Sequence, residues 1–138
     1  MMKHFIIPAC LLICATGCRN FSPAIEGSGA AKSERRTVDG FQGIEIHGSG
    51  RLEVIRGPQS PLELTADDNI LPLIETTIRN KVLVISERQN VRPKVDIAFK
   101  LVTPDLRNIT VSGAASVRLL DVKSEELNVH MSGAGDVY

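Results

Sequence analysis

The first candidate for ion chemistry is the run Asp67-Asp68-Asn69. Its side chains supply oxygens, which are the ligands that Ca²⁺ prefers. Three adjacent residues cannot all face one ion, however, and no glycine-spaced acidic loop follows them. We therefore predict that these residues cap a short helical turn rather than bind calcium.

A second candidate is the glycine-rich run Gly48-Ser49-Gly50, which could cradle a phosphate group. Phosphate-binding loops need a helix directly behind them, because free backbone N–H groups and the helix dipole hold the anion. Here the pattern predicts a strand after Gly50. The glycines are therefore expected to form tight turns in which neighbouring backbones approach closely.

Histidine could bind a metal or act as a base. His47 and His130 stand at matching points of a repeated pattern, and the third histidine, His4, lies in the leader. A zinc site needs three or four protein ligands, so two histidines on a polar strand face predict no metal site. Ser49, His47 and an aspartate could make a triad, but the spacing lacks the strand-turn-helix context of a nucleophile.

Cleavage of acidic polysaccharides by a parallel β-helix enzyme is the alternative enzymatic function. Such an enzyme needs carboxylates gathered on one face. The aspartates in question are spread among predicted turns and strand faces: Asp96, Asp105, Asp121 and Asp136. We therefore expect no catalytic residues and no cofactor, and keep this enzyme class as the alternative.

The first residues have the pattern of a bacterial export signal. Lys3 and His4 precede an apolar run over residues 5–15, which is too short to span a ~30 Å bilayer core as a helix. The run ends in Ala15-Thr16-Gly17-Cys18, which resembles a lipobox. Residues 1–17 are therefore predicted to be a lipoprotein signal peptide, with Cys18 as the lipidated residue.

All three cysteines, Cys10, Cys14 and Cys18, fall within this leader. The predicted mature body then has no disulfide, no thiolate metal site and no catalytic thiol. No acidic run follows Cys18, which favours a lipid anchor in the outer membrane facing the periplasm over display at the cell surface. Residues 18–36 lack apolar periodicity, and we expect a flexible tether that reaches roughly 25 Å.

The composition restricts the partners of the protein. The 138 residues are enough for one domain, and 16 basic residues balance 16 acidic ones. No strongly basic surface follows from this balance, so nucleic acid is a poor partner. With no Trp, one Tyr and four Phe, the core must be built from Val, Ile and Leu, which favour strands.

From Thr37 onward, apolar and polar residues alternate with the period of a half-buried strand. Pro72 prevents a long helix, so one short helical turn is predicted near residues 68–72. Asn80-Lys81 is predicted to be the turn of a hairpin between residues 74–79 and 82–86. The body is therefore expected to be all-β.

One pattern occurs three times, in residues 44–52, 109–117 and 129–137. Each copy has two apolar residues two apart, then small residues, then a further apolar residue. The last two copies are 20 residues apart, which predicts the stacked units of a right-handed β-solenoid or β-helix. The chain ends within the third copy, so we expect a truncated repeat and an exposed edge strand over residues 126–131, open to self-association.

Several motifs, taken in order, resemble the head GIN domain family, an auto-transporter adhesin domain. The strongest is Thr103-Pro-Asp-Leu-Arg-Asn-Ile-Thr-Val-Ser-Gly-Ala114, and residues 36–46, 62–70 and 74–85 continue the resemblance. The resemblance implies a repetitive all-β domain over residues 37–138, behind a lipoprotein or export signal. It brings no catalytic residues to this chain, and it implies further Ser-Gly repeats in longer members.

The combined expectation is a non-catalytic lipoprotein of the cell envelope with a binding or scaffolding role, adhesin-like in kind. Its partners would be the membrane, through the lipid anchor, and an envelope polysaccharide or protein. Polar positions expected to face that partner are Arg51, Glu53, Arg107, Arg118 and Asp121. The alternatives are the polysaccharide-active enzyme and a non-functional fragment of a longer family member.

Overall fold

The computed structural model describes residues 22–121 and 127–138, so the lipobox and Cys18 lie outside it. The elements in order are β1 (Ile25–Glu26), β2 (Ala31–Arg36), β3 (Gly43–Arg56), β4 (Leu62–Asp67), the 3₁₀ helix η1 (Leu71–Leu73), β5 (Ile74–Arg79), β6 (Val82–Glu87), β7 (Val91–Arg92), β8 (Ala98–Thr103), β9 (Asn108–Leu120) and β10 (Asn128–Gly133). The predicted all-β class is confirmed. Within the described residues, no helix is long and apolar enough to cross a membrane.

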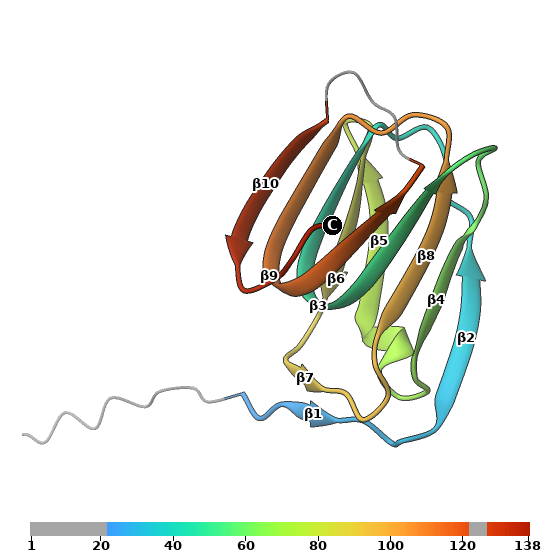
Figure 1. The fold of residues 1–138 in the computed structure, drawn as a ribbon. Coiled ribbons are helices and arrows are strands. Elements are labelled where there is room, and N and C mark those ends of the chain that lie inside the picture. Colours follow the sequence, from blue (N-terminus) through green and yellow to red (C-terminus); the bar gives the residue numbers. More distant parts are fainter. Residues whose placement is uncertain (1–21, 122–126) are drawn as a thin grey trace, which may run out of the picture.

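The long strand β3 organises the sheet because it bends in its middle and pairs with different strands on either side of the bend. Its first half pairs in parallel with β6, and its second half pairs in parallel with β8. Strand β9 follows β3 in parallel along almost its whole length, and β10 adds to β9 (Figure 1). The two halves of β3 therefore belong to two differently oriented parts of one sheet.

Antiparallel strands complete both parts. Strand β4 pairs with β8 on one side and β2 on the other, and β5 pairs with β6. The β5–β6 connection is the predicted hairpin, with Asn80 and Lys81 at φ of 50° and 63° as its tight turn requires. The predicted helical turn is the short η1, which lies slightly later in the chain than expected.

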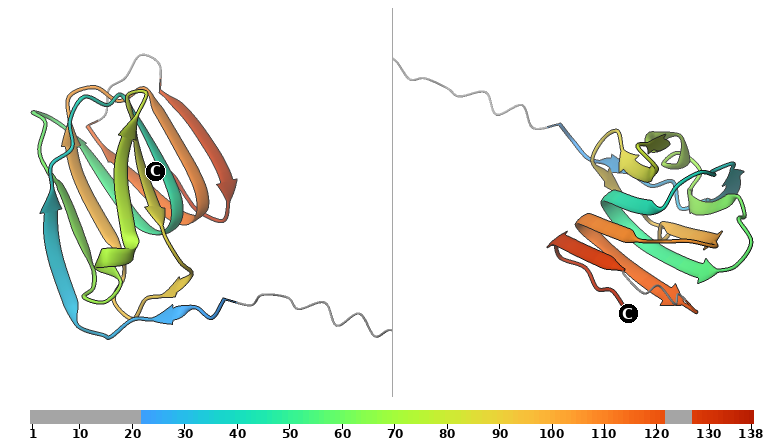
Figure 2. Two further views of the ribbon diagram at one scale, coloured as in Figure 1. Left: turned by 180° about the vertical axis from the view of Figure 1, so that it is seen from behind. Right: turned by 90° about the horizontal axis from the view of Figure 1, so that it is seen from above.

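The three copies of the repeated pattern lie side by side. Ile44 pairs with Ile109, and Ile109 pairs with Val129. Figure 2 shows β3, β9 and β10 as adjacent strands when viewed from above. Within the described residues, these three adjacent strands do not by themselves define complete coils of a solenoid. The right-handed solenoid therefore stays a prediction.

The apolar positions of the first two copies form the core. The apolar side chains at the three matching positions of each of these copies are 1% exposed or less: Ile44, Ile46, Leu52, Ile109, Val111 and Val117. The third copy differs, because Val129 is 43% exposed on the outer strand β10. The inward rows are thus buried only where a neighbouring strand covers them.

The prediction of a flexible tether over residues 18–36 is wrong for its second half. Strand β1 pairs with β7, and β2 pairs antiparallel with β4 along six residues. Strand β2 reads Ala-Lys-Ser-Glu-Arg-Arg and lies at the edge of the sheet, where an alternating apolar face is not required. The folded body therefore begins near Ile25 rather than at Thr37.

Candidate functional site

The glycine-rich run lies at the bend of β3, and its glycines form a stack that we call the glycine corner: Gly48, Gly113 and Gly133. All three have positive φ, of 134°, 113° and 126°. A Cβ added at Gly113 would collide with the carbonyl oxygen of Gly48, and one at Gly133 with that of Gly113. Glycine is therefore needed at this position of every copy, for conformation and for close approach between strands.

The same corner does not form a phosphate cradle. The backbone N–H of Ser49 donates to the Glu87 carboxylate at 3.0 Å, and the Ser49 hydroxyl donates to the same oxygen at 3.2 Å. A carboxylate of the protein thus already accepts the hydrogen bonds that Ser49 could offer to an anion, a contact that the sequence pattern does not predict.

The two histidines are not at equivalent positions, contrary to the prediction. His47 pairs with Ser112, whose partner in the third copy is Ser132, whereas His130 lies beside Thr110. Both side chains are exposed, and His47 contacts the Glu45 carboxylate. Among residues 22–121 and 127–138, no three His, Cys, Asp or Glu side chains gather closely enough to hold a metal ion.

The predicted helix cap is wrong. The run Asp67-Asp68-Asn69 instead forms hydrogen bonds with segments that are distant in the sequence. The residue before η1 is Ile70, and no side chain caps it. Asp67 is fully buried and accepts hydrogen bonds from the backbone N–H groups of Gly29 at 2.7 Å and of Lys94 and Val95 at 3.1 Å each.

The surroundings of Asp67 keep it ionised. Burial by itself would raise the pKa of the Asp67 carboxyl, but the backbone N–H groups of Gly29, Val95 and Lys94 outweigh burial and hold that pKa below its ordinary value. The buried carboxylate therefore joins the β1–β2 connection to the β7–β8 loop.

The aspartates considered for catalysis lie at separate places in the fold. Asp96 pairs with Arg51 at 3.2 Å, and Asp105 pairs with Arg107 at 3.4 Å. Asp121 follows the end of β9, and the backbone oxygen of Asp136 accepts from Val117. The structure thus does not build a catalytic carboxylate group from these residues.

A row of charges with alternating sign crosses the outward face of the second half of the sheet. Each pair lies in register on neighbouring strands: Arg118 beside Glu53, Glu53 beside Lys100, Lys100 beside Glu63, and Glu63 beside Arg35. Neighbouring strands are ~4.8 Å apart, so the row places opposite charges at regular steps. We call these five residues the charge row.

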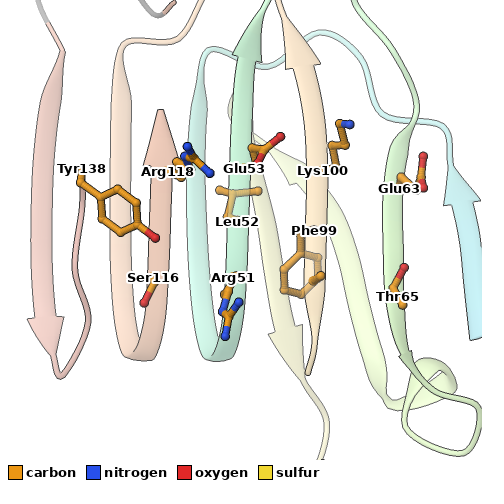
Figure 3. Close-up of a pocket in the computed structure, with 11 residues that line it drawn as sticks. Arg51, Leu52, Glu53, Glu63, Thr65, Phe99, Lys100, Ser116, Arg118 and Tyr138 are labelled. Carbon is orange, nitrogen blue, oxygen red and sulfur yellow. The ribbon is translucent and has the colours of Figure 1, made fainter. Parts of the chain in front are cut away.

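A depression of about 400 Å³ opens along this row, with Tyr138 at one side (Figure 3). The adjacent cross-strand line holds the short side chains of Ser116, Ala98 and Thr65, with Arg51 between Ser116 and Ala98. Leu52 and Phe99 also line it, although their side chains are buried and alternate along the strands with the outward-facing residues. It is larger than a second hollow, of about 230 Å³, beside Ser49, Gly50 and Pro93.

The outward residues predicted from the sequence divide into two groups. Arg51, Glu53 and Arg118 line the depression. Arg107 precedes β9 and Asp121 follows it, so they lie at opposite ends of the strand, and neither lines the depression. Sequence reasoning missed Glu63, Lys100 and Tyr138. The cross-strand register brings Glu63 and Lys100 to the depression, and backbone hydrogen bonds with Val117 and Leu119 of β9 bring Tyr138 there.

The fold and site define an all-β domain with a polar sheet face of mixed charge. Residues 40–138 match the family model described as "Putative auto-transporter adhesin, head GIN domain". This match covers most of the chain, so the chain belongs to that family, as its motifs indicated. A comparison with curated proteins finds no match.

Solved structures share the fold. A "putative adhesin" from Bacteroides fragilis is 21% identical, with a TM-score of 0.75 over 83% of this chain and 55% of that one. A "putative adhesin" from Parabacteroides merdae is 21% identical, with a TM-score of 0.70 over 80% and 47%. A "putative lipid binding protein" from Parabacteroides distasonis is 19% identical, with a TM-score of 0.73 over 83% and 51%. This chain spans about half the length of these structures.

Proposed function

We propose that this chain is a non-catalytic binding protein of the cell envelope, held by lipid on Cys18, whose adhesin-like domain recognises its partner through the charge row. The observation that carries the proposal is the depression beside that row on the outward sheet face (Figure 3). Membership of an adhesin-described family supports a binding role.

The regular spacing of the charge row suits an extended partner. A polymer lying across the strands meets a charge of alternating sign at each ~4.8 Å step. Tyr138 is 67% exposed and offers an amphipathic ring at one side of the depression. An envelope polysaccharide or an extended protein segment could make such contacts over several strands.

Polysaccharide cleavage is the alternative, and Glu53 and Glu63 are its candidate pair because both face the depression with Lys100 between them. The Glu63 side chain is 47% exposed and lies 4.0 Å from Arg35. Glu53 lies in register with Lys100 and Arg118. Both carboxylates thus have basic neighbours, which supports a binding role.

The proposed location rests on the export signal and lipobox. Lipid on Cys18 would hold the protein on the outer membrane, and the lack of an acidic run after Cys18 favours the periplasmic side. We also propose that β3, β9 and β10 are successive units of a right-handed solenoid, and that the outer edge of β10 allows self-association.

Co-sedimentation of the lipid-free body, residues 19–138, with isolated envelope fragments of the host cell tests the binding role. Arg118→Glu reverses one charge of the row, and Arg79→Glu is its matched control on an exposed position of β5. We expect the wild type and Arg79→Glu to sediment with the fragments, and Arg118→Glu to do so several-fold less. Equal sedimentation of both variants would exclude the charge row as the recognition surface.

Two further arms separate the alternatives. Fragments treated with protease or with polysaccharide-degrading enzymes show which polymer is bound. Release of reducing sugar ends that disappears in Glu53→Gln would favour the enzyme instead.

A further inference from the structure

The segment that follows the predicted anchor is fixed to one end of the domain. The backbone N–H of Ile25 donates to the Asn90 carbonyl at 2.8 Å, and that of Gly27 donates to the Arg92 carbonyl at 2.9 Å. These bonds join β1 to β7, and both strands lie at the same end of the molecule (Figure 1). We call it the β1–β7 end.

Polar side chains after β4 hold the next residues of this segment. Gly29 N–H donates to Asp67, Ser28 N–H donates to Asn69 at 2.9 Å, and the Asn69 amide donates to the Glu26 carbonyl at 2.8 Å. A Cβ on Gly27 would come within 2.5 Å of the Asp67 carboxylate, so the backbone fits closely over that buried charge. We call this set of contacts the N-terminal clamp.

The clamp shortens the connection between anchor and domain. Ile25 is the seventh residue after Cys18, since 25 − 18 = 7. Seven residues of flexible chain span about 15 Å on average and ~25 Å when fully extended. A tether running to Thr37 would instead have allowed the domain to turn freely at a much greater distance.

The two ends of the domain differ in distance from this attachment. Strand β5 starts beside η1, near the β1–β7 end, and its six residues run ~20 Å to the hairpin turn at the opposite end (Figure 1). The β2–β3 connection also lies at that opposite end, because β2 runs in the same direction. The anchor therefore reaches the β1–β7 end far more easily than the opposite end.

Two basic side chains at this end already have acidic partners. Arg92 pairs with Glu26 at 3.6 Å, and Arg88 pairs with Glu75. The orientation therefore follows from the length of the connection rather than from charge.

We propose that the β1–β7 end rests against the lipid headgroups of the membrane that holds Cys18, because the N-terminal clamp fixes that end beside the anchor. The sheet face that carries the charge row then extends away from the bilayer. This inference rests on the proposed lipid anchor at Cys18, and it adds the surface that contacts the membrane.

Depth-dependent quenching tests this orientation in the full lipidated chain. Gln89→Cys and Asp39→Cys each introduce the only thiol besides Cys18 in the predicted mature protein, at exposed positions near the β1–β7 end and in the β2–β3 connection. Each variant is labelled with a fluorophore and reconstituted into vesicles whose lipids carry a nitroxide on the headgroup. We expect several-fold stronger quenching at Gln89 than at Asp39.

Matched variants attribute the difference to the clamp. Inserting a flexible Gly-Ser segment of about 15 residues after Phe21 should make the two labels equally weakly quenched. Asp67→Asn should also reduce the difference, whereas Asp96→Asn, which removes the same charge from an exposed site at the same end, should not. The insertion keeps the test valid if Asp67→Asn fails to fold.

Incorporation of labelled palmitate, measured in parallel, separates the two proposals. Equal quenching at both positions in a protein that carries palmitate would overturn the orientation and leave the lipid anchor standing. A protein that carries no palmitate and stays in the soluble fraction would overturn both.

Discussion

Alanine in place of Gly113 tests whether close backbone stacking at the glycine corner holds the repeated strands together. Gly113 has a φ of 113°, and a residue with a side chain is strained there. An added Cβ would also collide with the Gly48 carbonyl oxygen and lie 3.1 Å from the Gly48 nitrogen. Both atoms belong to the backbone of the neighbouring strand, so neither can move without opening the β3–β9 pairing.

Gly40 provides the matched control, because it has a φ of 70° but an added Cβ would meet nothing within 4 Å. Gly40→Ala should therefore cost only the conformational strain, about 1–2 kcal/mol. Gly113→Ala should add overpacking of about 1–3 kcal/mol, for a total of about 2–5 kcal/mol. That total is a large part of a typical domain stability of about 5–15 kcal/mol.

Urea unfolding of residues 19–138, followed by far-UV circular dichroism, measures both free energies of unfolding. The dichroism signal suits a chain that has no Trp. Equal losses for Gly113→Ala and Gly40→Ala would refute the argument, because the cost would then be conformational strain without a contact between strands.

Further predictions follow from the core, the buried carboxylate, the outer strand and the anchor. Ile109→Ala should cost about 2–5 kcal/mol against about 0.5 kcal/mol or less for Arg107→Ala, and equal losses in a denaturant melt would mean that inside and outside are misassigned. The pKa of Asp67 is lowered in the folded protein, so its carboxylate stabilises the fold at pH values above its ordinary pKa of 3.8. The difference in the free energy of unfolding between the wild type and Asp67→Asn should therefore become smaller as the pH falls below that value. A difference that becomes larger in acid would contradict this reasoning. Val129→Lys should weaken self-association through β10, as measured by light scattering. A wild type that is monomeric at tens of micromolar concentration would show that β10 does not mediate self-association. Cys18→Ser should move the protein to the soluble fraction, whereas membrane retention after a salt wash would argue against the lipid anchor.

The sequence predicts the central part of the fold well because its signals there are local. The alternation of apolar and polar residues correctly predicts that Ile44, Ile46 and Ile109 are buried. The pair Asn80-Lys81 predicts the turn between β5 and β6 from local sequence alone. The repeated pattern also indicates register, because the copies pair in parallel even where 65 residues separate Ile44 from Ile109 (109 − 44 = 65).

Features that depend on distant partners are not visible in the sequence. Strand β2 is rich in charge and forms because β4 offers it an edge, so its own pattern resembles a linker. Asp67 accepts from Gly29, 38 residues earlier, and local reasoning assigns such a residue to a nearby cap. Arg118, Glu53 and Lys100 share a row only through the pairing of three strands, which single-strand alternation does not specify.

The most direct test of the central claim is co-sedimentation of the lipid-free body, residues 19–138, with envelope fragments of the host cell, comparing Arg118→Glu with Arg79→Glu. Our account predicts that wild type and Arg79→Glu bind alike and that Arg118→Glu binds several-fold less, because only Arg118 belongs to the charge row. Wild-type protein that stays in the supernatant, or that sediments equally with both variants, would contradict the claim that this face of the domain is a binding surface.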